Sequence, residues 1–538
     1  MDAIEHGPGR ASEGTVPRGE GTAGPPSPAG EGPVLLRLDS GTEWLLYFMI
    51  VFAPWAFGTT QGWSARVMNT AGFVLGGMAV VRRFAVHGLP AVASAKAGSQ
   101  PAVQSAQSAV GSSPHRGRGG KGGWAAGWLA GLTAAVLGYC LVSALNARAT
   151  YVPAEQRFDY HDCVGWLPHS FDSASSWRAF WRYLALAGMF WAARGWVLAG
   201  ARSEQGAAMA ADRRLPARLR RVLWVVSING ALLALEGIVQ RSLGTNRLLW
   251  LVLPFYNRSP ESQFGPYAYR GNAAEYLGMV WPLALGFWWV LRRGHSTPPG
   301  PRSAANLLLS CALLTLVAPL ISLSRAAALV TCASGVVALA MLLASRRRAG
   351  GKSGWGLAGL LVLAAVLSWY IGWHGLAQRF KRTDGDISSG RFLAWRTALQ
   401  MAKDFPVFGT GPGTFDSLYG LYRSSPEQRW EAYLHNDWLE TVVTFGAVGF
   451  AAVFLMFILA AGGWFFGGGG IPTPRGLVRF LWLSLAGCLA YAAMDFPLQV
   501  YSVLFLFLLI CSILSCLSRP GRGGAHNRES VGACGAQA

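Results

Sequence analysis

Residues 304–345 read AANLLLSCALLTLVAPLISLSRAAALVTCASGVVALAMLLAS. Two apolar runs stand on either side of one polar break, Ser322-Leu323-Ser324-Arg325. A helix needs roughly 20 apolar residues to cross the hydrocarbon core of a bilayer, and each run is about that long. The stretch therefore predicts two spanning helices joined by a tight turn, which is typical of an all-α protein that crosses a membrane several times.

The same pattern continues along most of the 538-residue chain. Hydrophobic residues make up 52% of it and charged residues only 13%, which is more apolar material than a soluble core of this size could bury. We predict about twelve spanning helices from these runs. They lie near residues 43–61, 67–86, 124–145, 177–199, 221–240, 273–291, 304–323, 326–345, 355–373, 437–461, 477–494 and 497–517.

The basic residues predict how these helices are oriented. The net charge is +20, but the lysines and arginines gather in short clusters between apolar runs, which argues against nucleic-acid binding. Basic residues of short loops stay in the cytoplasm. With both termini cytoplasmic, the cytoplasmic segments hold 28 of the 46 basic residues, and 146–176, 241–272 and 374–436 become outer loops.

Composition divides the chain further. The predicted parts are a disordered cytoplasmic tail (1–41), the first transmembrane helices with a low-complexity cytoplasmic linker (42–219, linker 87–123), a transmembrane core with a long outer loop (220–517, loop 374–436) and a second disordered tail (518–538). The eight cysteines lack metal-ligand spacing, and we expect them to pack inside the apolar runs without disulfides.

The long outer loop predicts a helix at the membrane surface. Ser388 or Ser389 can cap this helix, and Pro406 ends it. Arg391 falls in its first turn. Four apolar residues share one face at helical spacing, as expected of an amphipathic helix that lies on the bilayer: Phe392, Trp395, Leu399 and Ala402.

A second helix is expected after the glycine-dense stretch 409–415. Ser425-Pro426-Glu427-Gln428 combines a serine cap with proline at the first helical position and glutamine three residues after the cap. We expect this helix to run through His435 towards the next span. His435 would then lie at the outer membrane boundary.

Three residues of these outer segments are candidates for chemistry. His435 can exchange a proton near neutral pH, and its structural alternative is an interfacial or capping residue. Arg391 can bind a substrate phosphate or a lipid headgroup. Arg325 interrupts two apolar runs, where an arginine is costly unless it has a partner, a cavity or a path to the headgroups. Four tryptophans fit interfacial positions: Trp55, Trp63, Trp166 and Trp177.

Five stretches together resemble the O-antigen ligase and polymerase superfamily. They are 270–277 with Pro282, 322–325, 389–415, 435–440 with Gly446 and Gly449, and 495–497. The resemblance keeps this order across residues 220–515, while the linker 87–123 and Ala326 after the arginine depart from the family pattern. It implies an all-α, GT-C-like glycosyltransferase of the bacterial inner membrane, with its active site facing the periplasm.

The resemblance also implies the substrates and the site. The donor would be a glycan on undecaprenyl pyrophosphate and the acceptor lipid A-core or another glycan, with no cofactor and no metal. By position, the family's essential arginines correspond to Arg325 and Arg391, and its histidine to His435. Guanidinium groups suit a pyrophosphate leaving group. His435 would accept the proton of the acceptor hydroxyl, and direct attack would invert the anomeric centre.

Further polar residues near the outer face could bind sugar hydroxyls or orient His435, with hydrogen bonding between spans as the alternative for each. They are Arg270, Asn272, Asn436, Glu440 and Asp495. Asp384-Gly385-Asp386 could hold a divalent ion, but two carboxylates one residue apart are a weak signal for a metal site and favour a flexible turn.

Four functions fit these observations. A ligase would move a finished glycan to lipid A-core, a polymerase would join repeat units on the same carrier, and a protein O-oligosaccharyltransferase would differ in its acceptor. A transporter or flippase is the non-enzymatic alternative. Transporters place polar residues near the midplane on broken helices or repeats. Here no repeat is evident and the candidate residues gather at one face, which favours an enzyme, with a ligase as the first hypothesis.

Overall fold

The computed structural model describes residues 33–97, 123–207, 215–293, 304–347, 386–424, 432–466 and 470–519. Within these ranges, eight helices are long and apolar enough to cross a membrane. They are α2 (Gly62–Ala97), α3 (Gly123–Leu145), α4 (Ser173–Ala207), α5 (Ala217–Leu243), α6 (Arg270–Arg293), α7 (Ala304–Ile321), α8 (Arg325–Arg347) and α12 (Asp437–Ala461). The protein is therefore an all-α polytopic membrane protein, as the sequence predicts.

Three further helices coincide with predicted spans: α1 (Pro33–Trp55), α14 (Arg475–Tyr491) and α15 (Tyr501–Cys516). The remaining predicted span, 355–373, lies outside the described residues. α14 has 17 residues and α15 has 16, fewer than the roughly 20 that a full span needs. α15 is buried along almost its whole length and packs against α4, α6, α12 and α14, so it forms the centre of the bundle.

Small residues set the close approach of α2 and α4. A Cβ added at Gly188 would lie 2.5 Å from the Gly72 carbonyl oxygen, and one added at Gly72 would lie 2.4 Å from the Ala185 carbonyl oxygen. Helices in a membrane associate mainly through such close packing, because lipid tails are as apolar as the helix surfaces. The sequence of each helix alone does not reveal which of its glycines meets a neighbour.

The N-terminal tail is shorter than predicted. Residues 33–41, which composition assigned to a disordered tail, form the first turns of α1. The Asp39 carboxylate is buried and bridges Arg82 at 2.8 Å and Arg218 at 2.7 Å. Composition missed these first turns because the partners that hold them lie on α2 and α5, far along the chain.

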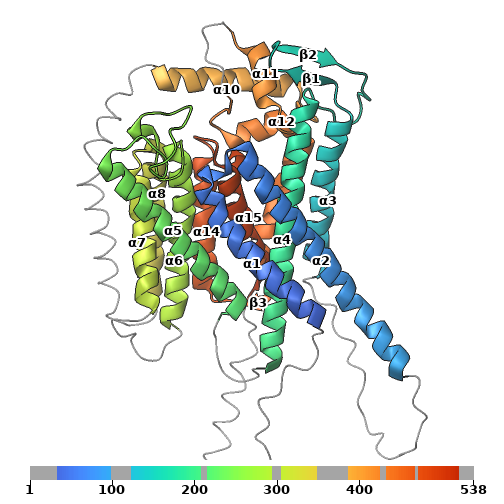
Figure 1. The fold of residues 1–538 in the computed structure, drawn as a ribbon, viewed down its shortest axis with the longest axis vertical. Coiled ribbons are helices and arrows are strands. Elements are labelled where there is room, and N and C mark those ends of the chain that lie inside the picture. Colours follow the sequence, from blue (N-terminus) through green and yellow to red (C-terminus); the bar gives the residue numbers. More distant parts are fainter. Residues whose placement is uncertain are drawn as a thin grey trace, which may run out of the picture.

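One end of the bundle carries most of the non-spanning structure. A hairpin of β1 (Ala149–Val152) and β2 (Arg157–Tyr160) lies there with α10 (Asp386–Asp404) and α11 (Phe415–Tyr422) (Figure 1). We call it the hairpin end. The sequence predicted neither the hairpin nor α11. The remaining short elements are η1 (Phe57–Thr59), η2 (Pro260–Ser262), η3 (Pro497–Gln499), α13 (Gly463–Phe466), β3 (Ile471–Pro472) and β4 (Leu517–Ser518).

The helix α10 lies across the hairpin end, at a steep angle to the spanning helices (Figure 1). It begins at Asp386 and ends at Asp404, close to the predicted bounds. The predicted apolar face was only partly right. Ala394, Ala398 and Met401 are the buried positions and pack against α11 and α12, whereas Phe392 and Leu399 are exposed. Ala394 and Ala398 occupy the buried face because their small side chains let α10 approach the bundle closely.

The prediction of a second helix in the outer loop, running from Ser425 through His435, is wrong for the residues that the structure describes. Residues 425–431 lie outside the described residues, and 432–436 are not helical. α12 begins only at Asp437, with Asn436 as its N-cap. The helix starts late because His435 adopts a left-handed backbone conformation in the candidate site.

Candidate active site

The candidate site is built around the buried carboxylate of Asp495, which follows α14. Its Oδ1 lies 2.7 Å from His435 Nδ1 and accepts from the Phe496 N–H at 3.2 Å. Its Oδ2 accepts from the hydroxyls of Tyr269 at 2.8 Å and Tyr491 at 3.0 Å. A buried carboxylate is stable only when such donors replace water. This one collects donors from the starts of α6 and α12 and from the end of α14.

His435 reaches this carboxylate from a left-handed backbone conformation, with φ at +56°. Such a conformation is uncommon for a residue other than glycine and persists only where its surroundings enforce it. The Asn436 side chain accepts from the Leu439 N–H at 3.1 Å, and the Glu440 carboxylate accepts from the Leu434 N–H at 2.9 Å. Two predicted substrate ligands, Asn436 and Glu440, therefore hold the turn that presents His435.

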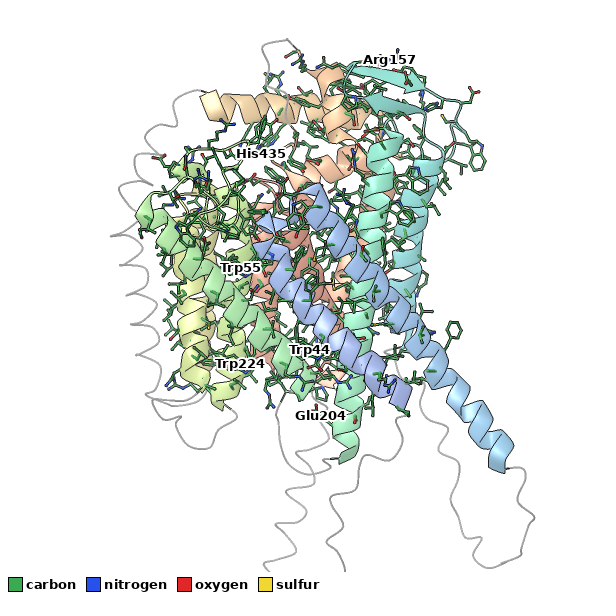
Figure 2. The ribbon with its side chains drawn as sticks, in the orientation of Figure 1. Trp44, Trp55, Arg157, Glu204, Trp224 and His435 are labelled. Carbon is green, nitrogen blue, oxygen red and sulfur yellow. The ribbon has the colours of Figure 1, made fainter. Side chains whose placement is uncertain are left out.

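The third member is Arg391 in the first half of α10. Its Nη1 donates to the Met494 carbonyl oxygen at 3.0 Å, and its Nη2 lies 3.3 Å from His435 Nδ1. Nδ1 cannot donate to Asp495 and also accept from a guanidinium. The contact with the Asp495 carboxylate is the shorter of the two, so we assign the proton to His435 Nδ1, which donates it to Asp495. His435 Nε2 is then the basic nitrogen. Figure 2 places His435 below α10 at the hairpin end, and Glu204 at the opposite end.

Aromatic rings form the wall of the site beside His435. Tyr269 stacks on Phe496 with ring centroids 5.5 Å apart, and Tyr433 stacks on Phe496 at 4.6 Å. His435 meets the same Phe496 ring edge-on at 4.8 Å. The rings restrict the orientation of the imidazole and exclude water from one side of it.

The charges around Asp495 keep it ionised. Burial raises the pKa of this carboxyl, but the hydrogen bond and charge of His435, together with the charge of Arg391, outweigh burial and hold the pKa below its usual range. Asp495 is thus an anion that orients the His435 imidazole.

Residues 310–454 match a family model described as O-antigen ligase. This match supports the O-antigen ligase superfamily. The resemblance found in the sequence is thereby confirmed, and the match includes Arg325, Arg391 and His435. No curated protein matches the chain. Asp495 and Tyr269 lie outside the matched residues, although they contact the histidine and its partner.

Arg325 lies within the matched residues, as the first residue of α8 and directly after the predicted tight turn. Leu323 in that turn has φ at +62°, and Arg241 Nη2 donates to the Ser322 carbonyl oxygen at 3.2 Å. Ser324 Oγ lies 3.4 Å from the Tyr491 hydroxyl, which in turn binds Asp495. The start of α8 is therefore joined to the His435 cluster through one tyrosine.

The predicted ligands Arg270 and Asn272 lie at the start of α6, before the matched residues. Arg270 is the first residue of α6, and its Nη1 donates to the Glu261 carbonyl oxygen at 2.7 Å. Asn272 is buried in the first turn. Arg270 follows Tyr269 directly, so both stay beside the cluster. The side chains of the Asp384–Asp386 hypothesis lie outside the described residues.

Sequence reasoning missed Tyr269, Tyr491 and Arg182. Tyr491 precedes Asp495 by four residues, a spacing that could have been read as one helical turn, and Tyr269 adjoins the motif at 270–277. Arg182 was detectable as an ionisable residue inside a predicted apolar span. Its Nη1 donates to the Gln499 carbonyl oxygen at 3.0 Å, and its Nε is buried without a hydrogen-bond partner among the described residues.

An apolar cavity of about 200 Å³ lies below the site, between α3, α4, α12 and α15. Thr441, Leu498 and Gln499 line it together with deeper residues such as Phe190, Met456 and Phe507. Thr441 lies one turn after Asp437 on α12, and Gln499 is the residue whose carbonyl oxygen binds Arg182. The cavity therefore runs from the neighbourhood of the site into the membrane-spanning part of the bundle.

The variant Asp495→Asn tests the central carboxylate without any assay of function. We expect a lower thermal midpoint at pH 7, because His435 and Arg391 lose their anionic partner, at a cost of about 1–3 kcal/mol. Since the pKa of Asp495 is depressed, its contribution is present above about pH 4 and is lost as the pH falls through the folded-state pKa. The difference from the unsubstituted protein should therefore shrink in acid.

Thermal melts in detergent micelles between pH 7 and pH 3 measure this difference. Asp404→Asn is the matched control, because Asp404 is an exposed carboxylate at the end of α10. A difference for Asp495→Asn that stays constant across the pH range would contradict the ionised state assigned to Asp495.

Proposed function

We propose that this membrane enzyme transfers a glycan from undecaprenyl pyrophosphate to lipid A-core or a related acceptor, as an O-antigen ligase. The observation that carries the proposal is the cluster of Arg391, His435 and Asp495 within an O-antigen ligase-type protein. It combines a base, an anion that orients the base and a cation that never loses its charge.

In the proposed reaction, an acceptor hydroxyl attacks the anomeric carbon of the donor sugar. His435 Nε2 takes the hydroxyl proton while the new C1–O bond forms. Asp495 holds the imidazole through Nδ1 and stabilises the imidazolium that results, so it acts as a positioning residue. The bond between C1 and the pyrophosphate oxygen breaks, and its electron pair leaves with the lipid pyrophosphate.

Negative charge grows on the pyrophosphate as that bond breaks, and Arg391 and Arg325 would neutralise it. Both arginines belong to segments tied to the Asp495 cluster. Arg391 donates to the carbonyl oxygen of Met494, next to Asp495, and the start of α8 is tied through Ser324 and Tyr491. A fixed cation in a site partly closed to water stabilises such charge more strongly than water does. Arg270 and Asn272 would contact the sugar at the start of α6.

A lipid-linked donor is supported by the apolar cavity below the site. Its lining is almost wholly hydrocarbon and aromatic, which suits a prenyl chain but not a nucleotide sugar. The prenyl chain of the donor would lie between α4 and α12, while its pyrophosphate stays near Arg391 and Arg325.

We place the site in the periplasm and the opposite end in the cytoplasm of a bacterial inner membrane. Arg82 and Arg218, from two of the basic clusters, meet at Asp39 near the cytoplasmic ends of α1, α2 and α5. Lysine and arginine accumulate on the cytoplasmic side of membrane proteins. The hairpin end, with His435, then faces outward.

The variants His435→Ala, Arg391→Ala and Arg325→Ala test the proposed roles. We expect glycan transfer to fall by about 10²–10⁴-fold without the base and by about 10²–10³-fold without either arginine. Purified protein is given undecaprenyl-pyrophosphate glycan and either lipid A-core or a carrier-linked glycan, and the products are separated on a gel.

Arg396→Ala is the matched control, because Arg396 is an exposed arginine of the same helix as Arg391. It should transfer glycan normally. Normal transfer by all three site variants would mean that these residues are interface anchors, and the transporter hypothesis would then lead. Transfer only to the carrier-linked glycan would assign a polymerase instead of a ligase.

The anomeric configuration of the product provides a separate test. One base and direct attack opposite the pyrophosphate predict inversion at C1. NMR of the transferred sugar reads the configuration. Retention would require a covalent intermediate or a second reacting group and would exclude the single-displacement mechanism.

Chelation tests whether the arginines replace a metal ion. Two guanidinium groups supply the positive charge that a divalent cation supplies in many phosphate-transfer sites, so we expect transfer to continue in EDTA. Loss of transfer in EDTA and its recovery with Mg²⁺ or Mn²⁺ would show that a metal takes part.

A further inference from the structure

A loop at the hairpin end exposes an unusually continuous set of apolar side chains. It connects α5 to α6, and we call its residues 248–256 the apolar loop. Leu251, Phe255 and Tyr256 are 74%, 76% and 76% exposed, and Trp250, Val252 and Leu253 are between 43% and 44% exposed. Single exposed apolar residues need no explanation, but a contiguous group indicates a surface that another apolar phase covers.

The apolar loop continues the outward face of α5. Five residues of that helix are exposed at helical spacing and form a stripe along its length: Ile228, Leu232, Leu235, Val239 and Leu243. The helix then ends at Gly244 in the left-handed conformation. The stripe on a candidate spanning helix faces lipid, so the apolar loop extends a lipid-facing surface beyond the helix end.

The tip of the apolar loop pairs part of its own backbone. Leu248 and Val252 exchange two hydrogen bonds, at 2.8 and 3.1 Å, and the N–H groups of Trp250 and Leu251 donate to the carbonyl oxygens of Arg247 and Leu248. Leu249 and Trp250 adopt positive φ values to close this turn. Non-helical backbone enters an apolar phase only when its polar groups are paired internally. The turn pairs four of its N–H groups in this way, those of Leu248, Trp250, Leu251 and Val252.

Two arginines flank the apolar side chains. Arg247 Nη1 donates to the Leu251 carbonyl oxygen at 3.2 Å, and Arg258 Nε donates to the Phe255 carbonyl oxygen at 3.3 Å. The Arg258 guanidinium also lies 5.9 Å from the centre of the Phe255 ring. Both side chains are exposed and positive, at the two ends of the apolar stretch. A phospholipid surface binds segments that combine an apolar tip with basic side chains at its edges.

The base of the same connection is fixed beside the candidate site. Arg241 donates to the carbonyl oxygens of Pro260 at 2.9 Å and Gln263 at 2.8 Å, and Gln240 accepts from the Gly265 N–H at 2.6 Å. Arg270 donates to the Glu261 carbonyl oxygen. The depth of the apolar loop in a bilayer would therefore set the depth of Tyr269 and Arg270.

We propose that the apolar loop inserts into the phospholipid leaflet at the hairpin end, with Arg247 and Arg258 at the phosphate level, and so fixes the α6 side of the site at the membrane surface. The partner is the bilayer itself. This inference does not depend on the reaction proposed above.

The experiment places an environment-sensitive fluorophore, NBD, on Leu251→Cys or Phe255→Cys. Cys163, Cys332 and Cys534 are replaced by serine, because Cys163 and Cys332 are at least partly accessible and Cys534 lies outside the described residues. The full chain is reconstituted in vesicles of phosphatidylethanolamine and phosphatidylglycerol, with or without doxyl-labelled phosphatidylcholine. Tyr160→Cys is the matched control, because Tyr160 is an aromatic residue 68% exposed on the hairpin.

We expect blue-shifted emission and several-fold stronger quenching by doxyl lipid at positions 251 and 255 than at 160. Equal, weak quenching at all three positions would place the apolar loop in water and overturn the proposal. Blue-shifted emission at 251 and 255 without lipid quenching would overturn it too, because a protein surface would then cover the loop.

Discussion

The carboxylate of Asp495 is the point at which the hairpin end of the bundle is tied together. Removing a carboxylate from water is costly, and the cost is offset only if donors reach both oxygens. Here the donors come from the starts of α6 and α12 and from the end of α14. Three helix ends are thereby held in register. Displacement of any one of them would take a donor away from this buried charge.

The same requirement explains why the histidine has an unfavourable backbone conformation. A helix that began before His435 would carry the imidazole in a different direction. The chain instead turns at His435 with a positive φ, and Asn436, Glu440 and Trp395 hold the flanking peptide groups. The cost is of order 1–3 kcal/mol, and it yields an imidazole with a fixed orientation and tautomer. A base that is already oriented needs no reorganisation during reaction.

The arginines at the two ends of the bundle have different kinds of partner. At the end that we assign to the cytoplasm, Asp39 joins two arginines of separate helices and fixes α1 to the bundle. At the hairpin end, arginines lie beside a histidine, a polar turn and the apolar loop. The ion pairs of Asp39 join helices to one another, whereas the arginines at the hairpin end lie where a phosphate group can approach.

The sequence by itself determined that the chain spans a membrane many times, because length and apolar content of a run decide insertion without reference to partners. It also predicted the tight turn before Arg325, the helix that carries Arg391, and the resemblance that the family match confirms. Periodicity failed where packing decides. Ala394 and Ala398, not Phe392, fill the buried face of α10, and α1 begins at Pro33 because its partners are on distant helices.

Only the tertiary structure decided which polar residues meet. Asp495 is 60 positions from His435, and Tyr269 is 226 positions from Asp495, so no local pattern could pair them. The sequence left open whether Asn436 and Glu440 bind sugar hydroxyls or orient His435, and in the fold both accept from backbone N–H groups beside the turn that holds it. A polar residue near a membrane face can serve a substrate or a backbone N–H group. The choice depends on the donors and acceptors that the folded chain brings within reach.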